Sequence, residues 1–320
     1  IRDRDVTGVQ TCALPISDYS LPPSFRSSRG SWTAGPGTDR YSVRITPSAP
    51  LELFCNYSFA IVEGEAFGLN VLDKYSFSFT TAYDPAPKFP EITDDELLTL
   101  VQKRTFKYFW DYAHPVSGLA RERLGSGETV TAGGSGFGVM AIPVGIERGF
   151  ITREEGAERL RTIARFLAYS ADRFHGAFPH WMNGTSGKVI PFGQDDDGGD
   201  LVETAFLLEG LLTAREYFDR DSEADIRAVI DNIWDSVEWD WYLHGQEVLY
   251  WHWSPSAGWA MNMPIRGWNE ALMVYVLAAS SPTHPVSADV YHEGWASGGG
   301  MKPSVDGPLF FAHYSFLGLD

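Results

Sequence analysis

Residues 93–113, TDDELLTLVQKRTFKYFWDYA, carry the pattern that decides the fold of most of this chain. Thr93 and Glu96 are spaced as a capping box, in which each side chain bonds the other residue's backbone at a helix start. Apolar and aromatic residues then recur every three or four positions from Leu97 to Tyr112. That period gives a helix one apolar face, so the stretch predicts an amphipathic helix through about residue 113.

The helical period continues through the rest of the chain. Thr152 and Glu155 repeat the capping box. No strand pattern alternates with the helical segments, so a parallel βαβ sheet is not expected. We predict five more helices, the first of them bent or broken by Pro143: 137–148, 157–174, 200–218, 222–237 and 266–279.

The residues before 93 have a different character. Residues 6–16, VTGVQTCALPI, resemble the translation of a sequencing adapter, so we treat residues 1–16 as an artefact of sequence assembly. The true start of the protein is then missing as well. Residues 17–40 are rich in Ser, Pro and Gly and are expected to be irregular.

Residues 41–82 show the alternation of apolar and polar side chains that predicts β-strands. Tyr75, Phe77 and Phe79 fall on one face of such a strand, which we expect to be half-buried. The sequence SFSFTT and the proline-rich linker 83–92 that follows it resemble the end of a bacterial immunoglobulin-like module. About half of such a β-sandwich would be present.

The composition limits the classes of ligand. Among 320 residues, 42 are acidic and 25 basic, for a net charge of −17, which argues against nucleic acids and anionic membrane surfaces as partners. No apolar run reaches the roughly 18 residues of a membrane-spanning helix. Two cysteines, Cys12 and Cys55, cannot form a disulfide scaffold or a four-thiolate zinc site. Eleven Trp suggest either a flat-faced neutral ligand such as a carbohydrate, or core packing.

The first candidate site is an acidic loop that leads into a helix, GQDDDGGDLVETAFL at 193–207. Asp200 and Glu203 are three residues apart and share a helix face, with Asp196 in the loop before them. Crowded carboxylates have separated pKa values, which an acid and a base in glycoside hydrolysis require. A solvated acidic cap and a calcium loop are the alternatives, although Gly199 occupies a position where an EF-hand needs a ligand.

The second candidate site is an aromatic loop, HWSPSAGWAMNMPIRGWNEALMVY at 252–275. Glu270 begins an apolar helix there, and a carboxyl beside indole rings has a raised pKa, which suits a general acid. A helix-terminal Glu stabilised by the helix dipole is the alternative. The candidates for binding sugars, which core packing would explain equally, are His180, Trp181, Trp253, Trp259, Arg266, Trp268 and Asn269.

Several ordered segments between residues 92 and 320 resemble the glucoamylase-type domain of bacteria. They include FKYFWDYAHPVSGLARE, DDDGGDLVETAFLLEGLLTAREYF, the aromatic loop and GPLFFAHYSFLGLD. The closest characterised group is glycoside hydrolase family 144, the endo-β-1,2-glucanases. This resemblance implies a mainly α fold, in which residues 93–320 form about the first half of an (α/α)6 toroid, truncated at its C-terminus. We expect a chain that ends there to be inactive.

The resemblance also implies an activity, the inverting hydrolysis of β-glucosidic bonds in a neutral glucan, with no metal or organic cofactor. We expect a monomer that binds a polysaccharide or oligosaccharide, does not insert into a membrane, and is secreted or periplasmic.

The family's functional acids fall on residues that the sequence pattern also selects: Asp196, Asp200, Glu203 and the separate Glu270. Our hypothesis makes Glu270 the proton donor, Asp200 or Glu203 the group that activates or positions water, and Asp196 a supporting group. An inverting pair is separated by about 6.5–9.5 Å.

Two alternatives stay open at this point. One is a non-catalytic carbohydrate-binding protein. The other is a hydrolase or phosphorylase of another glucan on the same barrel, and a phosphorylase would need a basic phosphate pocket from Arg121, Arg123 and Arg266.

Overall fold

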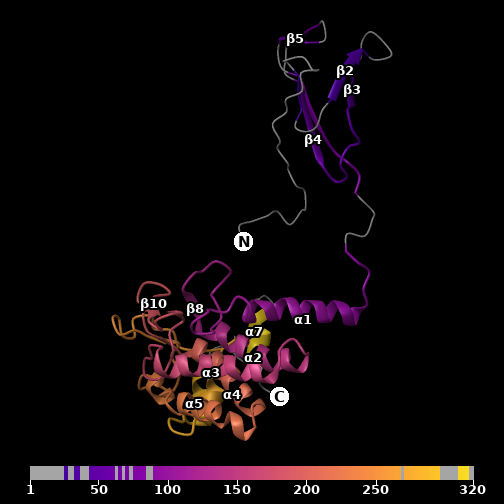
Figure 1. Cartoon of the computed structure of the whole chain (residues 1–320). Helices are drawn as coiled ribbons and strands as arrows, with labels where there is room; N and C mark the ends of the chain where they lie inside the picture. Colours follow the sequence, from indigo (N-terminus) through magenta and orange to yellow (C-terminus); the bar gives the residue numbers. More distant parts are fainter. Residues whose placement is uncertain are drawn as a thin grey trace. The chain divides into compact units, whose positions relative to one another are not determined.

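The structure is a computed structural model that describes residues 25–27, 32–36, 43–61, 64–66, 69–71, 75–83, 89–267, 270–295 and 309–316 (Figure 1). The chain divides into two compact units, Ile1–Ile92 and Thr93–Asp320. The division falls where the predicted linker ends and the first predicted helix begins.

The N-terminal unit contains short antiparallel strands. One sheet has the order β1-β4-β7, and β2–β3 and β5–β6 form separate pairs. Tyr57 and Phe59 of β4 are buried. The strand bounds are β1 Phe25–Ser27, β2 Trp32–Pro36, β3 Val43–Pro47, β4 Asn56–Ile61, β5 Gly64–Ala66, β6 Leu69–Val71 and β7 Tyr75–Thr80.

Two expectations for this unit need correction. The stretch 17–40 is not wholly irregular, because β1 pairs with β4 and β2 pairs with β3, and backbone pairing of this kind does not depend on apolar side chains. The strand β7 forms as predicted but is not half-buried, since Phe77 and Phe79 are 42% and 38% exposed. Their rings stack on Phe59 across the strand pair.

The second unit is mainly α, as predicted. Both capping boxes are present, Thr93 with Glu96 and Thr152 with Glu155, and α1 and α3 each begin directly after the capping threonine. The predicted helix 157–174 starts later than α3 and extends beyond its end at Tyr169. The helices are α1 Asp94–Trp110, α2 Ala132–Glu147, α3 Arg153–Tyr169, α4 Leu201–Tyr217, α5 Ala224–Asp235, α6 Leu272–Ser280 and α7 Leu309–His313.

Glycines allow α2 and α4 to pack backbone against backbone. A Cβ added to Gly136 would lie 2.1 Å from the carbonyl oxygen of Phe206, and one added to Gly210 would lie 2.2 Å from the carbonyl oxygen of Gly136. No side chain fits such a gap. The predicted helix 137–148 begins earlier in the structure, at Ala132, and Pro143 lies within α2.

The helix α1 buries less of its apolar face than its sequence predicts. Its first half exposes Leu97, Leu98 and Val101, and Phe106 is its buried side chain. The contact with α2 is made by the second half, where Phe106 lies over Gly145 and Phe109 over Gly138.

Short strand pairs join the loops between the helices, although the sequence showed no strand pattern there. The sheet β10-β9-β8 links the residues before α2 to the loop after α3. The pair β11–β12 sets Asp200 opposite His252. Their bounds are β8 Thr129–Thr131, β9 Trp181–Asn183, β10 Val189–Ile190, β11 Gly199–Asp200 and β12 His252–Trp253.

The helical core is formed mainly by α2 to α6. Figure 1 shows α3 beside α2 and α5 near α4. Leu160, Leu201 and Leu207 are fully buried in this core, together with the aromatic rings of Phe178 and Trp239. In the described part of the chain, no helix combines the length and apolar character needed to span a bilayer.

Candidate active site

Asp200 stands at the centre of the candidate site as the N-cap of α4. Its Oδ1 accepts hydrogen bonds from the backbone N–H groups of Val202 and Glu203, at 3.0 and 2.9 Å. Its Oδ2 lies 3.0 Å from Nδ1 of His180. The Asp200 carboxyl is buried. Its hydrogen bonds with the backbone N–H groups replace the water that burial removes.

Glu203 lies in the first turn of α4 and is held by residues at the start of α2. Its Oε2 accepts hydrogen bonds from the backbone N–H of Gly133, at 2.8 Å, and the hydroxyl of Thr131, at 3.1 Å. A Cβ at position 133 would lie 2.7 Å from Oε2, so a larger residue there would force the Glu203 carboxyl to shift. Burial and the charge of Asp200 raise the pKa of Glu203 above its ordinary value.

His180 balances this negative charge. Burial lowers its pKa, but the hydrogen bond to Asp200 and the charges of Glu203 and Asp196 outweigh burial and raise it to about 9. The ring is therefore an imidazolium at neutral pH, with Nδ1 donating to Asp200. Sequence analysis proposed His180 for sugar binding, and the structure places it against the carboxylates themselves.

Asp196 is buried in the loop before β11. Its Oδ1 lies 3.4 Å from Nδ1 of His252, an ion-pair separation rather than a well-formed hydrogen bond. Burial raises the pKa of Asp196, the charge of His252 lowers it, and Asp200 and Asp197 raise it further. Asp196 and Asp200 are thus close enough to repel each other.

Glu270 shares the electrostatic environment of these acids. Burial raises its pKa to about 7, with further upward contributions from the charges of Glu203 and Asp200 and a downward one from His180. Its backbone carbonyl accepts a hydrogen bond from the Ser315 hydroxyl, at 2.7 Å. The two distant segments selected from the sequence therefore come within electrostatic range of each other.

Two aromatic groups flank the acids. In the first, Phe192 lies 4.0 Å from the His180 ring and 4.8 Å from Trp181, between ring centroids. In the second, Trp241 stacks on His175 with 3.8 Å between ring centroids, Trp253 meets it edge-on, and Trp259 is tilted to it at 6.3 Å. Phe192 is 49% exposed and Trp241 is 40% exposed, so both offer an open ring surface.

Four participants in this arrangement were missed by sequence analysis. Phe192 and Trp241 lie in loops where other Trp residues drew attention, and only the fold exposes their rings. Thr131 and Gly133 contact Glu203 across 72 and 70 positions of sequence, and no local signal predicts such a contact.

The remaining predicted binding residues have other surroundings. Trp268 and Asn269 lie outside the described residues. Arg266 donates a hydrogen bond to the carbonyl of Gly294 at 3.0 Å. Arg121 donates to the carbonyl oxygens of Tyr112 and Gly127, and Arg123 pairs with Glu122. These contacts do not favour the phosphate pocket that a phosphorylase would need.

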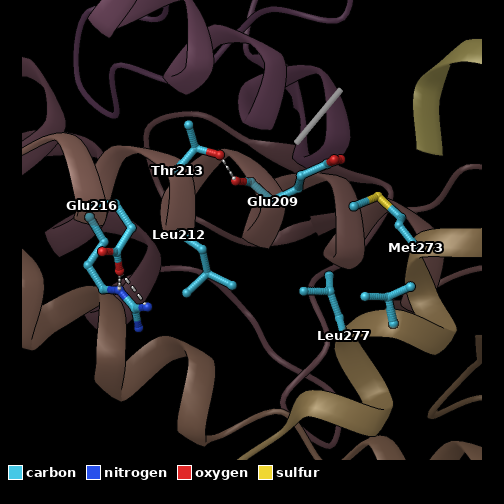
Figure 2. Close-up of a pocket in the computed structure, with 8 residues that line it drawn as sticks. Glu209, Leu212, Thr213, Glu216, Met273 and Leu277 are labelled. Carbon is cyan, nitrogen blue, oxygen red and sulfur yellow. Dashed lines mark hydrogen bonds and ion pairs between the residues drawn. The ribbon is translucent and has the colours of Figure 1, made fainter. Parts of the chain in front are cut away.

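A pocket lies between α4 and α6 (Figure 2), and its lining does not include the four candidate acids. It has a volume of about 220 Å³ and is lined by Leu212, Met273 and Leu277, with Glu209 and Glu216 among its polar residues. None of the predicted catalytic residues lines it. Within the described residues, no group of three or more His, Cys, Asp and Glu side chains has an arrangement that could hold a metal ion.

A mainly α domain in which carboxyls share one electrostatic environment near open aromatic rings is compatible with a protein that acts on carbohydrates. Comparison with known proteins agrees. Residues 262–320 match the model of a family described as Putative glucoamylase. The chain is also 47% identical, over 265 residues, to an exo β-1,2-glucooligosaccharide sophorohydrolase (non-reducing end) of Parabacteroides distasonis, covering 72% of this chain and 37% of that relative.

Solved structures show the same relationship. A putative glucoamylase from Bacteroides uniformis is 55% identical, with a TM-score of 0.69 over 72% of this chain and 61% of its own. An endo-β-1,2-glucanase from Chitinophaga pinensis, in complex with sophorotriose and glucose, is 51% identical, with the same TM-score and coverage. This chain spans about three fifths of those structures. The resemblance to the glucoamylase-like domain and to β-1,2-glucan hydrolases is thereby confirmed.

Proposed function

We propose that this protein hydrolyses β-glucosidic bonds in a neutral glucan, and that its substrate is a β-1,2-glucan. The observation that carries the proposal is the shared environment of Glu270, Asp200 and Glu203. A carboxyl with a pKa of about 7 is protonated in a large fraction of molecules at neutral pH, as a general acid must be. The named activities of the relatives support the linkage.

In this proposal Glu270 protonates the oxygen of the leaving sugar. Asp200 accepts three hydrogen bonds, including one from the cationic His180, so its carboxyl is held in place to position and activate a water molecule. Glu203 is the second candidate for that role, and Asp196 supports the pair. Hydrolysis with inversion places water and leaving group on opposite faces of the sugar.

The finer description of the fold belongs to the same proposal. We interpret residues 93–320 as part of an (α/α)6 toroid and the N-terminal strands as part of an immunoglobulin-like module. A polymeric substrate would be met outside the cytoplasm, so we propose a secreted or periplasmic protein that acts as a monomer.

The test is a panel of glucans offered to the product of the complete gene. Reducing ends should be released from linear β-1,2-glucan at least about 100-fold faster than from β-1,3- or α-1,4-glucan, and NMR of the first product should show the inverted anomer. Binding of β-1,2-glucan without release of reducing ends would instead indicate a carbohydrate-binding protein. Release that requires phosphate would indicate a phosphorylase.

A further inference from the structure

His252 and Ser254 form a chain of contacts with Asp196 that the proposed reaction does not yet use. Nδ1 of His252 lies 3.4 Å from Oδ1 of Asp196, and Nε2 lies 2.9 Å from the Ser254 hydroxyl oxygen. His252 is 2% exposed, Ser254 is fully buried and Asp196 is 7% exposed. The order of groups is that of an Asp-His-Ser triad.

The hydrogen bonds of Ser254 show that it is not a nucleophile. Its hydroxyl donates to the backbone carbonyl of Asp195, which can only accept, and its oxygen accepts from the backbone N–H of Asp197 at 3.2 Å. The single hydroxyl hydrogen is therefore already used. A buried hydroxyl with this partner can reach neither a sugar nor a water molecule.

The same bonds fix the proton on the His252 ring. Because the Ser254 hydrogen points to Asp195, the contact with Nε2 forms only if Nε2–H is the donor. The lone pair of a neutral ring is then on Nδ1, where it faces a carboxylate oxygen of Asp196. Two lone pairs repel each other, so a proton on either group is needed to make this contact favourable.

We propose that His252 and Ser254 are positioning residues for Asp196: Ser254 holds the His252 ring with Nε2 protonated, so that Nδ1 faces the Asp196 carboxyl at ion-pair distance and influences its charge. The effect of this positioning on turnover rests on the proposed function. Asp196 also faces Asp200, His180 and its neighbour Asp197, which all act on its proton affinity. Among these groups, His252 is the one whose ring orientation is fixed by its hydrogen bond to Ser254.

The first test is NMR spectroscopy of the protein with labelled His and Asp side chains, which does not require activity. Long-range proton–nitrogen spectra should show His252 with Nε2 protonated throughout the titration. His252→Gln removes the group that lowers the proton affinity of Asp196, so the pH at which Asp196 takes up its proton should rise by about one unit, a tenfold change in affinity. Ser254→Ala should release the ring into a mixture of tautomers.

His114→Gln is the matched control, because His114 is also 2% exposed and also contacts a carboxylate, that of Glu128, at 3.3 Å. It should leave the Asp196 titration unchanged. A neutral His252 protonated on Nδ1 alone, or an Asp196 titration that His252→Gln does not move, would overturn the proposal.

The second test is the pH profile of kcat on β-1,2-glucan with the product of the complete gene. Its acidic limb should move in the same direction as the Asp196 titration in His252→Gln, and stay in place in His114→Gln. An unmoved limb beside a shifted titration would overturn the role in turnover. If no glucan is hydrolysed, the proposed function fails, and the NMR result decides the positioning of Asp196 alone.

Discussion

The raised pKa of Glu270 has a consequence for folding that can be measured without any substrate. Its pKa is about 7 in the folded chain against 4.5 as an ordinary Glu, a difference of at most about 3 kcal/mol. Glu270 is partly exposed, so solvent screening reduces this to about 1–2 kcal/mol. Between these two pH values the folded state binds the extra proton, so stability falls as pH rises from 4.5 to 7.

Glu270→Gln removes the ionisable group and with it this penalty. The variant should be about 1–2 kcal/mol more stable than the parent at pH 8, seen as a melting temperature about 3–6 °C higher, and equally stable at pH 4. Pairing it with Glu203→Gln should give less than the sum of the two gains, since the two charges repel. Glu154→Gln, at a side chain 79% exposed, is the control and should show no such gain. A gain equal at pH 4 and pH 8, or strict additivity with Glu203→Gln, would refute the reasoning.

Three further substitutions test the packing around the site. Gly136→Ala should lower the free energy of chemical unfolding by at least about 3 kcal/mol, because its Cβ would meet a backbone oxygen of α4. Gly193→Ala, with open space around it, is the control and should change this free energy little. Equal effects of the two substitutions would contradict the packing. Thr152→Ala removes the cap of α3 and should cost about 1 kcal/mol by the same assay, and an unchanged midpoint would count against the capping box. Gly133→Ala should displace Glu203 and lower kcat about 10–100-fold with the circular dichroism spectrum preserved; wild-type kcat would show that this contact is dispensable.

The sequence predicted the parts of the fold that local chemistry determines. The two Thr–Glu capping boxes gave the starts of α1 and α3, and the apolar runs gave the presence of α2, α4, α5 and α6. The start of α6 was placed too early, at Arg266. Gly267 has a positive φ of 73°, which ends any helix there, and Ile265 is tied to Leu249 by a backbone hydrogen bond of 2.8 Å.

The sequence selected the acids of the candidate site but not the contacts that hold them. Asp196, Asp200, Glu203 and Glu270 were selected from charge clustering, from helix position and from a family resemblance, and the structure brings them into one electrostatic environment. The contact of Asp196 with His252 depends on two-residue strands, β11 and β12, which are too short to show a period in sequence.

The central claim is that Glu270 and Asp200 act on one bound glucan, and steady-state kinetics of the complete gene product test it most directly. Glu270→Gln and Asp200→Asn should each lower kcat on linear β-1,2-glucan by about 100-fold or more, because each removes a proton-transfer or water-positioning group from the reaction. If both variants keep a kcat close to that of the parent protein, the carboxyls that meet in this structure are not its catalytic groups.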